Sequence, residues 1–127
     1  NQIDDWSFSD TKNAEVDTKK WQSTFKLKEN GWYFYVKQNV RLAPGKYNIA
    51  LPVIQENANG ASLLEVKIND KKIRIPRKDK EFSWEITVEK WQEIEIYVYV
   101  SRSEVSKDQM QKVLEVTYGT LTLLGAN

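Results

Sequence analysis

Residues 33–53 (YFYVKQNVRLAPGKYNIALPV) alternate apolar and polar side chains on both sides of a proline-glycine pair. A period of two places successive side chains on opposite faces of the backbone, which is typical of a half-buried β-strand. Pro44 presets the backbone angle φ at the first corner of a turn, and Gly45 takes a positive φ without a steric clash. The stretch therefore predicts two consecutive strands joined by a turn at residues 43–45.

Shorter alternating runs, separated by turn residues, occupy most of the remaining chain. They lie at residues 1–9, 21–27, 62–68, 72–76, 81–88, 91–101 and 113–124. About eight to ten short strands with hardly any helix indicate an all-β protein, either an antiparallel β-sandwich or a barrel. We expect residues 10–20 to form a surface loop, and Gly119 to mark a bulge in the last strand.

The stretch at residues 102–112 is the one that looks helical. Ser106 and Gln109 have the spacing of a helix capping box, in which a serine side chain accepts a hydrogen bond from a backbone N–H three residues later. Because the stretch is short and polar, we expect a single helical turn or a loop.

Parity also divides the tryptophans into core and surface candidates. Trp6, Trp21 and Trp84 share parity with aliphatic neighbours, which favours burial. Trp91 opens a strand and is expected to pack rather than bind a ligand. Trp32 follows an Asn-Gly turn at the mouth of a strand, where it could be a binding platform or a plug at the end of the sandwich.

The best candidate binding surface is the outward parity of two strands. Flat aromatic rings stack on the C–H faces of sugars, while charged and amide groups bind hydroxyls. Outward tyrosines can equally reflect β-propensity and cross-strand pairing, so this alternative stays open. If the two strands share a sheet, the candidate site comprises Tyr33, Tyr35, Lys37, Arg41, Glu95, Tyr97 and Tyr99, with Trp32 beside it.

Composition excludes several classes of function. Nineteen basic and eighteen acidic residues leave a net charge of +1, so no strong field attracts nucleic acid or an anionic membrane. Histidine and cysteine are absent, which removes the commonest general base and any disulfide. Glu93 and Glu95 project from one strand instead of flanking a cleft, as a glycosidase would require. We therefore expect no enzymatic activity.

No cofactor is predicted. Calcium would need oxygen ligands at regular spacing, and the available aspartates lack it, so solvation at the surface is the favoured interpretation. The aspartates concerned are Asp4, Asp5, Asp10 and Asp17.

The segment at residues 71–80 (KKIRIPRKDK) carries six basic side chains. Basic strands can bind phosphate, including anionic polymers of cell walls. The alternative is a solvated strand edge on which lysines prevent pairing with other chains.

Two stretches resemble the jelly-roll carbohydrate-binding modules that accompany bacterial glycosidases and occur in phage tail and baseplate proteins of Gram-positive hosts. Residues 36–49 (VKQNVRLAPGKYNI) resemble the family's strand–turn–strand pattern Q-x-V-x-L-x-P-G, and residues 91–96 (WQEIEI) resemble its later W-x-x-V-x-V strand. Many of these modules hold calcium through an acidic residue near the last strand. Here residues 116–119 read VTYG, without an aspartate.

The resemblance implies a jelly-roll sandwich that spans residues 1–127 and belongs to a larger extracellular, cell-surface or virion protein. It implies a non-catalytic module that binds a host or cell-wall polysaccharide or oligosaccharide, with no nucleic-acid or membrane partner. The alternative is a structural or adhesion module of a phage tail or cell-surface assembly that docks another protein.

Overall fold

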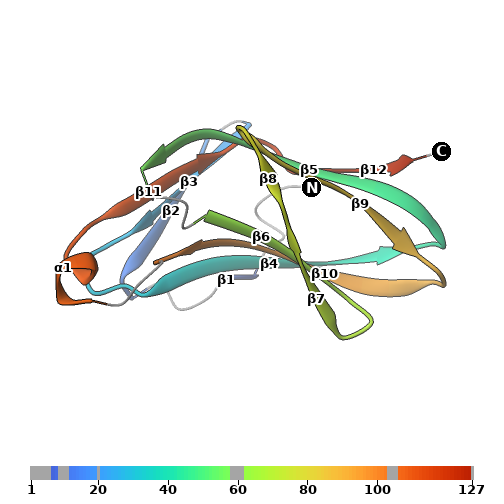
Figure 1. Ribbon diagram of the computed structural model, residues 1–127, viewed down its shortest axis with the longest axis horizontal. Helices are drawn as coiled ribbons and strands as arrows, with labels where there is room; N and C mark the ends of the chain where they lie inside the picture. Colours follow the sequence, from blue (N-terminus) through green and yellow to red (C-terminus); the bar gives the residue numbers. More distant parts are fainter. Residues whose placement is uncertain (1–6, 9–11, 20, 58–61, 103–105, 127) are drawn as a thin grey trace.

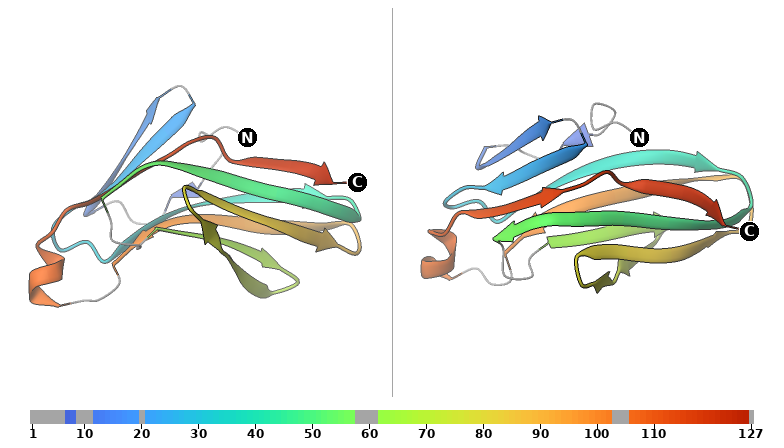
Figure 2. Two further views of the ribbon diagram at one scale, coloured as in Figure 1. Left: turned by 45° about the horizontal axis from the view of Figure 1, so that its top comes forward. Right: turned by 90° about the horizontal axis from the view of Figure 1, so that it is seen from above.

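Two antiparallel β-sheets pack face to face in the computed structural model, which describes residues 7–8, 12–19, 21–57, 62–102 and 106–126 (Figures 1 and 2). The five-stranded sheet has the order β1 (Ser7–Phe8), β4 (Tyr33–Leu42), β10 (Gln92–Ser101), β6 (Ser62–Ile68), β7 (Lys71–Ile75). The seven-stranded sheet has the order β2 (Ala14–Lys19), β3 (Gln22–Leu27), β11 (Leu114–Tyr118), β5 (Gly45–Asn57), β9 (Glu81–Val88), β8 (Arg77–Lys78), and β12 (Thr122–Ala126) also pairs with β5. The predicted antiparallel jelly-roll sandwich is confirmed.

The described residues contain twelve strands, more than the expected eight to ten. Two of them, β1 and β8, are only two residues long. Another strand that was not expected is β2, which occupies a segment predicted to be a loop. It pairs with β3 from Ala14 opposite Leu27 to Lys19 opposite Gln22. The segment was missed because only Ala14 and Val16 carry its apolar alternation, so main-chain hydrogen bonds define the strand more than side chains do.

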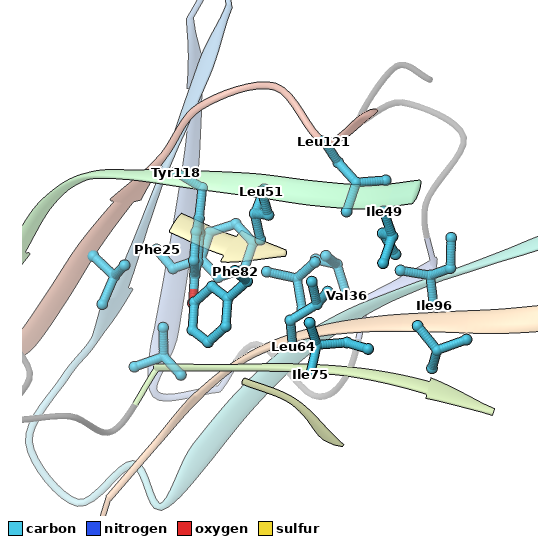
Figure 3. Close-up of a cluster of buried hydrophobic side chains, with 14 of the residues drawn as sticks. Phe25, Val36, Ile49, Leu51, Leu64, Ile75, Phe82, Ile96, Tyr118 and Leu121 are labelled. Atoms are coloured by element: carbon cyan, nitrogen blue, oxygen red, sulfur yellow. The ribbon is translucent and has the colours of Figure 1, made fainter. Parts of the chain in front are cut away.

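The core lies between the sheets, where the inward positions of both meet (Figure 3). Phe25 of the seven-stranded sheet contacts Phe34 of the other sheet edge to face, with ring centroids 5.5 Å apart. Tyr118 packs against Phe25 at 5.2 Å and donates its hydroxyl to the Tyr99 carbonyl across the sandwich at 2.7 Å. Burying each such ring contributes about 1.5–3 kcal/mol, so these three residues join the sheets.

Two tryptophans expected in the core are exposed. Trp21 exposes 72% of its surface because it occupies the turn between β2 and β3 with a φ of 71°, so the parity of a strand does not apply to it. Trp84 has the predicted inward parity and lies opposite the buried Ile49, yet it is 47% exposed. Beyond β9 only the two-residue β8 follows, and the sandwich is therefore open at Trp84. Trp6 lies outside the described residues.

The predicted turn and bulge are both present. Gly45 has a positive φ of 152°, and the Tyr47 hydroxyl donates to the Ala43 carbonyl at 2.7 Å across the turn. The pairing of β11 with β5 shifts register between Thr117 and Tyr118, just before Gly119. The last strand is consequently divided into β11 and β12, which follow one another along β5 (Figure 2).

The predicted helical turn is confirmed as α1 (Lys107–Met110). The Ser106 hydroxyl accepts a hydrogen bond from the Gln109 backbone N–H at 3.2 Å, as the capping-box spacing predicts. In Figure 1, α1 stands at one end of the sandwich, between β10 and β11 in chain order.

We expect Gly31→Ala to lower the free energy of unfolding by about 1–3 kcal/mol, because a side chain there overpacks the protein. An added Cβ would lie 2.7 Å from the Asn13 carbonyl oxygen and 2.8 Å from the Leu27 side chain. Gly125→Ala is the matched control, since nothing lies within 4 Å of its added Cβ. Urea unfolding measures both variants; equal midpoints would contradict the proposed close approach at Gly31.

Candidate functional site

The outer face of the five-stranded sheet brings four tyrosines together. In the register of β4 against β10, Tyr35 lies opposite Tyr99, and Tyr33 lies opposite Ser101. Tyr97 follows on the same face, opposite Lys37. The two strands on which the sequence prediction depended, β4 and β10, are therefore direct neighbours. We call the surface made by Tyr33, Tyr35, Tyr97 and Tyr99 the tyrosine face.

The four rings contact one another in a continuous cluster. Tyr33 and Tyr35 are nearly parallel, with ring centroids 6.1 Å apart and planes inclined by 4°. Tyr35 is 5.7 Å from Tyr97 and 5.5 Å from Tyr99, and Tyr97 is 5.9 Å from Tyr99. Aromatic contacts at these distances stabilise each pair by about 0.5–1.5 kcal/mol beyond their burial, so the rings hold each other in place.

The rings differ in their access to solvent. Tyr33 is 50% exposed, whereas Tyr35 and Tyr99 are half-buried. Tyr97 is only 9% exposed, and the Lys72 ammonium lies over its ring at 5.0 Å from the centroid. Outward parity predicted the side of the sheet correctly for Tyr97 but not its exposure, because a long side chain from β7 covers the ring.

Trp32 extends the aromatic cluster at the Tyr33 end. The two ring centroids are 6.3 Å apart, edge to face, and Trp32 is 57% exposed. Both rings border a pocket of about 170 Å³. Of the two sequence-based alternatives, an exposed platform therefore agrees better with the structure than a plug. The residues lining this pocket are Lys12, Asn13, Ala14, Asn30, Gly31, Trp32 and Tyr33.

Arg102 holds the loop that carries Trp32. Its buried guanidinium donates to three backbone carbonyls: Gly31 at 2.5 Å, Gln109 at 2.5 Å and Lys28 at 2.9 Å. Its own backbone N–H donates to the Trp32 carbonyl at 3.1 Å. Burial lowers the pKa of Arg102 from its usual value. The sequence analysis missed this residue because its partners are main-chain atoms of distant segments.

Charged side chains from β4, β10 and β6 lie beside the tyrosine face. Glu95 lies between two lysines, with Lys37 Nζ at 3.3 Å from one carboxylate oxygen and Lys67 Nζ at 3.6 Å from the other. Partial burial would raise the pKa of Glu95, but hydrogen bonds from Lys37 and Tyr97 and the charges of the two lysines lower it overall. The predicted site residues Lys37 and Glu95 therefore form an ion pair beside the rings.

Two phenols on this face, those of Tyr97 and Tyr99, have a raised pKa. Burial, followed by the nearby charge of Glu95, raises the pKa of Tyr97. Burial and the charge of Glu65 raise the pKa of Tyr99 to about 12. Both hydroxyls are protonated at neutral pH, and each donates to a neighbouring carboxylate, Tyr97 to Glu95 and Tyr99 to Glu65.

Arg41 does not join the tyrosine face. It lies opposite Glu93 near the far end of β4, about 26 Å along the strand from Tyr33. Its guanidinium carbon lies 5.8 Å from the centroid of the exposed Trp91 ring, a cation–π contact. This end of the sheet forms a separate aromatic position, and Trp91, which was expected to pack, is 60% exposed.

Four charged residues near the rings were not included in the predicted site, although two of them, Lys72 and Arg74, belong to the basic segment at residues 71–80. Their parity was readable from the sequence, but nothing local indicated that β6 and then β7 lie beside β10. Within the sheet, Glu65 is opposite Tyr97, and Lys67 is opposite Glu95. The four residues are Glu65 and Lys67 of β6, and Lys72 and Arg74 of β7.

The described residues offer no other obvious site. Among them, no cluster of three or more Asp or Glu side chains is arranged to hold a metal ion. Of the aspartates considered for calcium, Asp17 lies exposed on β2, and the other three are outside the described residues. The described part of the chain contains no helix with the length and apolar character required to cross a bilayer.

Comparison with known proteins relates this chain to others by fold. No protein-family model matches the sequence, and no curated protein matches it. The enzymatically active domain of tailspike protein 4 from bacteriophage CBA120 is similar with a TM-score of 0.68 and 11% identity, over 98% of this chain and 20% of that one. The chain thus spans about a fifth of the tailspike structure.

Two carbohydrate-binding modules match over nearly their whole length. TmCBM61, solved in complex with β-1,4-galactotriose, has a TM-score of 0.61 and 17% identity, over 98% of this chain and 91% of that one. A CBM4 structure has a TM-score of 0.59 and 12% identity, over 99% and 90%. At these identities the similarity establishes a β-sandwich fold like that of carbohydrate-binding modules.

We expect the stability of the wild-type protein to fall between pH 10 and about 12, partly through Tyr99. Below pH 10 the phenol is protonated in both folded and unfolded chains. Above it the unfolded chain loses the proton first, so rising pH favours unfolding until the folded-state pKa is passed. Tyr99→Phe should reduce this alkaline decrease in Tm, measured by thermal melts across the range; an unchanged decrease would contradict the assignment.

Arg102→Met should lower the free energy of unfolding by about 1–3 kcal/mol, because three carbonyls lose their shared donor. Arg74→Met is the control, since Arg74 is an exposed residue whose Nε lies 3.9 Å from Glu65, and surface changes of this kind stay within about 0.5 kcal/mol. Urea unfolding measures both. A loss in Arg74→Met as large as in Arg102→Met would refute the role of Arg102.

Proposed function

We propose that this protein binds a saccharide reversibly through Trp32 and the tyrosine face. The proposal depends mainly on the row of contacting rings that runs from the exposed Trp32 and Tyr33 to Tyr35. The ion pair of Lys37 and Glu95 lies next to this row. Sugar rings present apolar C–H faces and polar hydroxyl edges together, so they require aromatic and hydrogen-bonding groups side by side. This surface offers both kinds of group within one sheet.

The comparisons support this proposal at the level of fold. The sandwich is similar to that of TmCBM61, whose structure contains β-1,4-galactotriose, and to a CBM4 structure. The chain of the tailspike structure is about five times as long as this chain. We propose that residues 1–127 are one saccharide-binding module of a larger extracellular, cell-surface or virion protein.

Catalysis is assigned to other parts of that parent protein. Glu93 and Glu95 project from the same face of β10, and paired carboxylates of a glycosidase must stand on either side of the scissile bond. Glu95 is also engaged by two lysines, which keep its pKa low and thereby oppose a role as a general acid.

The alternative is a module that docks another protein. Within the described residues, β12 pairs only with β5, and Leu124 on β12 is a large exposed apolar side chain, as is Ile54 on β5. A strand edge with exposed apolar groups is a common place for a second chain to bind. Light scattering separates the two hypotheses: a stable oligomer whose formation protects Tyr33 favours docking, and a monomer with accessible tyrosines favours saccharide binding.

Tyr33→Ala combined with Tyr35→Ala should weaken binding to the recognised glycan at least tenfold, because the stacking surface is lost. Binding would be measured on a glycan array and by pull-down with cell-wall polysaccharide. Trp84→Ala is the matched control, since it removes an exposed aromatic ring from the other sheet. Equal loss in the control, or wild-type binding in the double variant, would refute the proposal.

The Tm of each variant distinguishes a binding defect from a folding defect. Tyr33 is half-exposed, so its removal should change Tm little. Trp32→Ala supplies a second, independent test, because this exposed ring lies at the end of the row and buries little surface. Reduced glycan binding with a normal Tm in this variant supports the proposal; wild-type binding limits recognition to the tyrosines and contradicts the inclusion of Trp32.

A further inference from the structure

Two lysines contact one carboxylate beside the tyrosine face, and a third lysine lies over a neighbouring ring. Lys37 of β4 and Lys67 of β6 both contact Glu95, and Lys72 of β7 covers the Tyr97 ring two residues farther along β10. Glu95 neutralises one of the three positive charges. The remaining two are in excess, although the whole chain carries a net charge of only +1.

The acidic residue nearest to this group does not remove the excess. Glu65 has its own basic neighbour in Arg74, whose Nε lies 3.9 Å from the Glu65 carboxylate across the β6–β7 pair. This pair cancels within itself. Among the described residues, positive charge is therefore concentrated around Tyr97, at the polar end of the aromatic row.

The arrangement of Lys67 and Lys72 is unfavourable for the protein alone. The two residues are direct partners across β6 and β7, and like charges opposite one another destabilise a sheet. No carboxylate contact is recorded for Lys72 among the described residues, where its partner is the Tyr97 ring. Features that oppose stability in this way occur at functional sites. A bound anion would remove the repulsion by contacting both ammonium groups.

We propose that the ligand is an acidic glycopolymer, with sugar rings on Trp32, Tyr33 and Tyr35 and an anionic group held by Lys67 and Lys72. The inference rests on the proposed saccharide-binding function and specifies the class of saccharide. The anionic group is a carboxylate, as in a uronic acid, or a phosphate, as in a polyol-phosphate wall polymer. Both are recognised through charge-assisted hydrogen bonds from lysine.

Affinity gel electrophoresis tests the carboxylate and phosphate sources separately. The probes are polygalacturonate, poly(glycerol phosphate) and, as neutral matched polymers, fully methyl-esterified polygalacturonate, galactan and mannan. Wild-type protein should be retarded by at least one acidic polymer and not by the esterified form. Raising the salt concentration should weaken this retardation, because exposed charges are screened.

The variants Lys67→Gln and Lys72→Gln should each weaken acidic-polymer binding roughly tenfold, the value expected for a lost hydrogen bond to a charged group. Lys71→Gln is the matched control: it removes an adjacent exposed lysine that lies opposite Ile68, on the other side of the sheet. Lys72→Gln should leave Tm close to that of the wild type, since the variant removes both a repulsion from Lys67 and a cation–π contact with Tyr97. A lower Tm in Lys72→Gln would overturn the argument from repulsion.

The outcomes separate this inference from the proposed function. Equal binding of neutral polymers, unaffected by Lys67→Gln and Lys72→Gln but lost in Tyr33→Ala, would overturn the acidic class and leave saccharide binding intact. Acidic-polymer binding that the lysine variants lose and Tyr33→Ala retains would support the anion site and contradict recognition of sugar rings. An equal loss of acidic-polymer binding in Lys71→Gln would show general charge attraction and overturn the proposed anion site. If no polymer retards the wild-type protein, both proposals are overturned.

Discussion

The antiparallel pairing of β4 with β10 is the interaction on which the candidate site depends. It runs over ten residue pairs, from Tyr33 opposite Ser101 to Leu42 opposite Gln92. Because side chains alternate across a strand, this one register directs Phe34 and Val36 into the core and Tyr33 and Tyr35 to the outer face. A shift by one residue would reverse both sets, so the apolar core also specifies where the rings lie.

The sequence predicted the sides of the sheets better than the depth of burial. Local alternation correctly assigned Tyr97 to the outer face and Trp84 to the inner parity. Exposure depends on neighbours that are distant in sequence: Lys72 covers Tyr97, and the shortness of β8 leaves Trp84 open. The contributions of β6 and β7 to the site, and the carbonyls that bind Arg102, likewise require long-range pairing that no local pattern encodes.

Within the site, aromatic and charged groups are separated along the sheet. The rings of Trp32 and Tyr33 lie at one end, where Arg102 anchors the loop, and the lysines that contact Glu95 lie farther along β4 and on β6. Loop residues are usually the least ordered part of a binding surface. Here the buried guanidinium of Arg102 binds two carbonyls of the loop, those of Lys28 and Gly31, and its backbone N–H binds the Trp32 carbonyl, so the exposed indole is presented by a restrained backbone.

The exposure of Trp21, Trp32, Trp84 and Trp91 has a spectroscopic consequence. Indole emission shifts to longer wavelength in water, and these side chains already face water in the folded protein. Unfolding therefore changes the surroundings of these four indoles little, and their emission is an insensitive reporter of denaturation. The chromophores that lose a packed environment on unfolding are phenol and phenyl rings such as Tyr118 and Phe25, which makes near-ultraviolet circular dichroism of tyrosine the better optical measure of the native state.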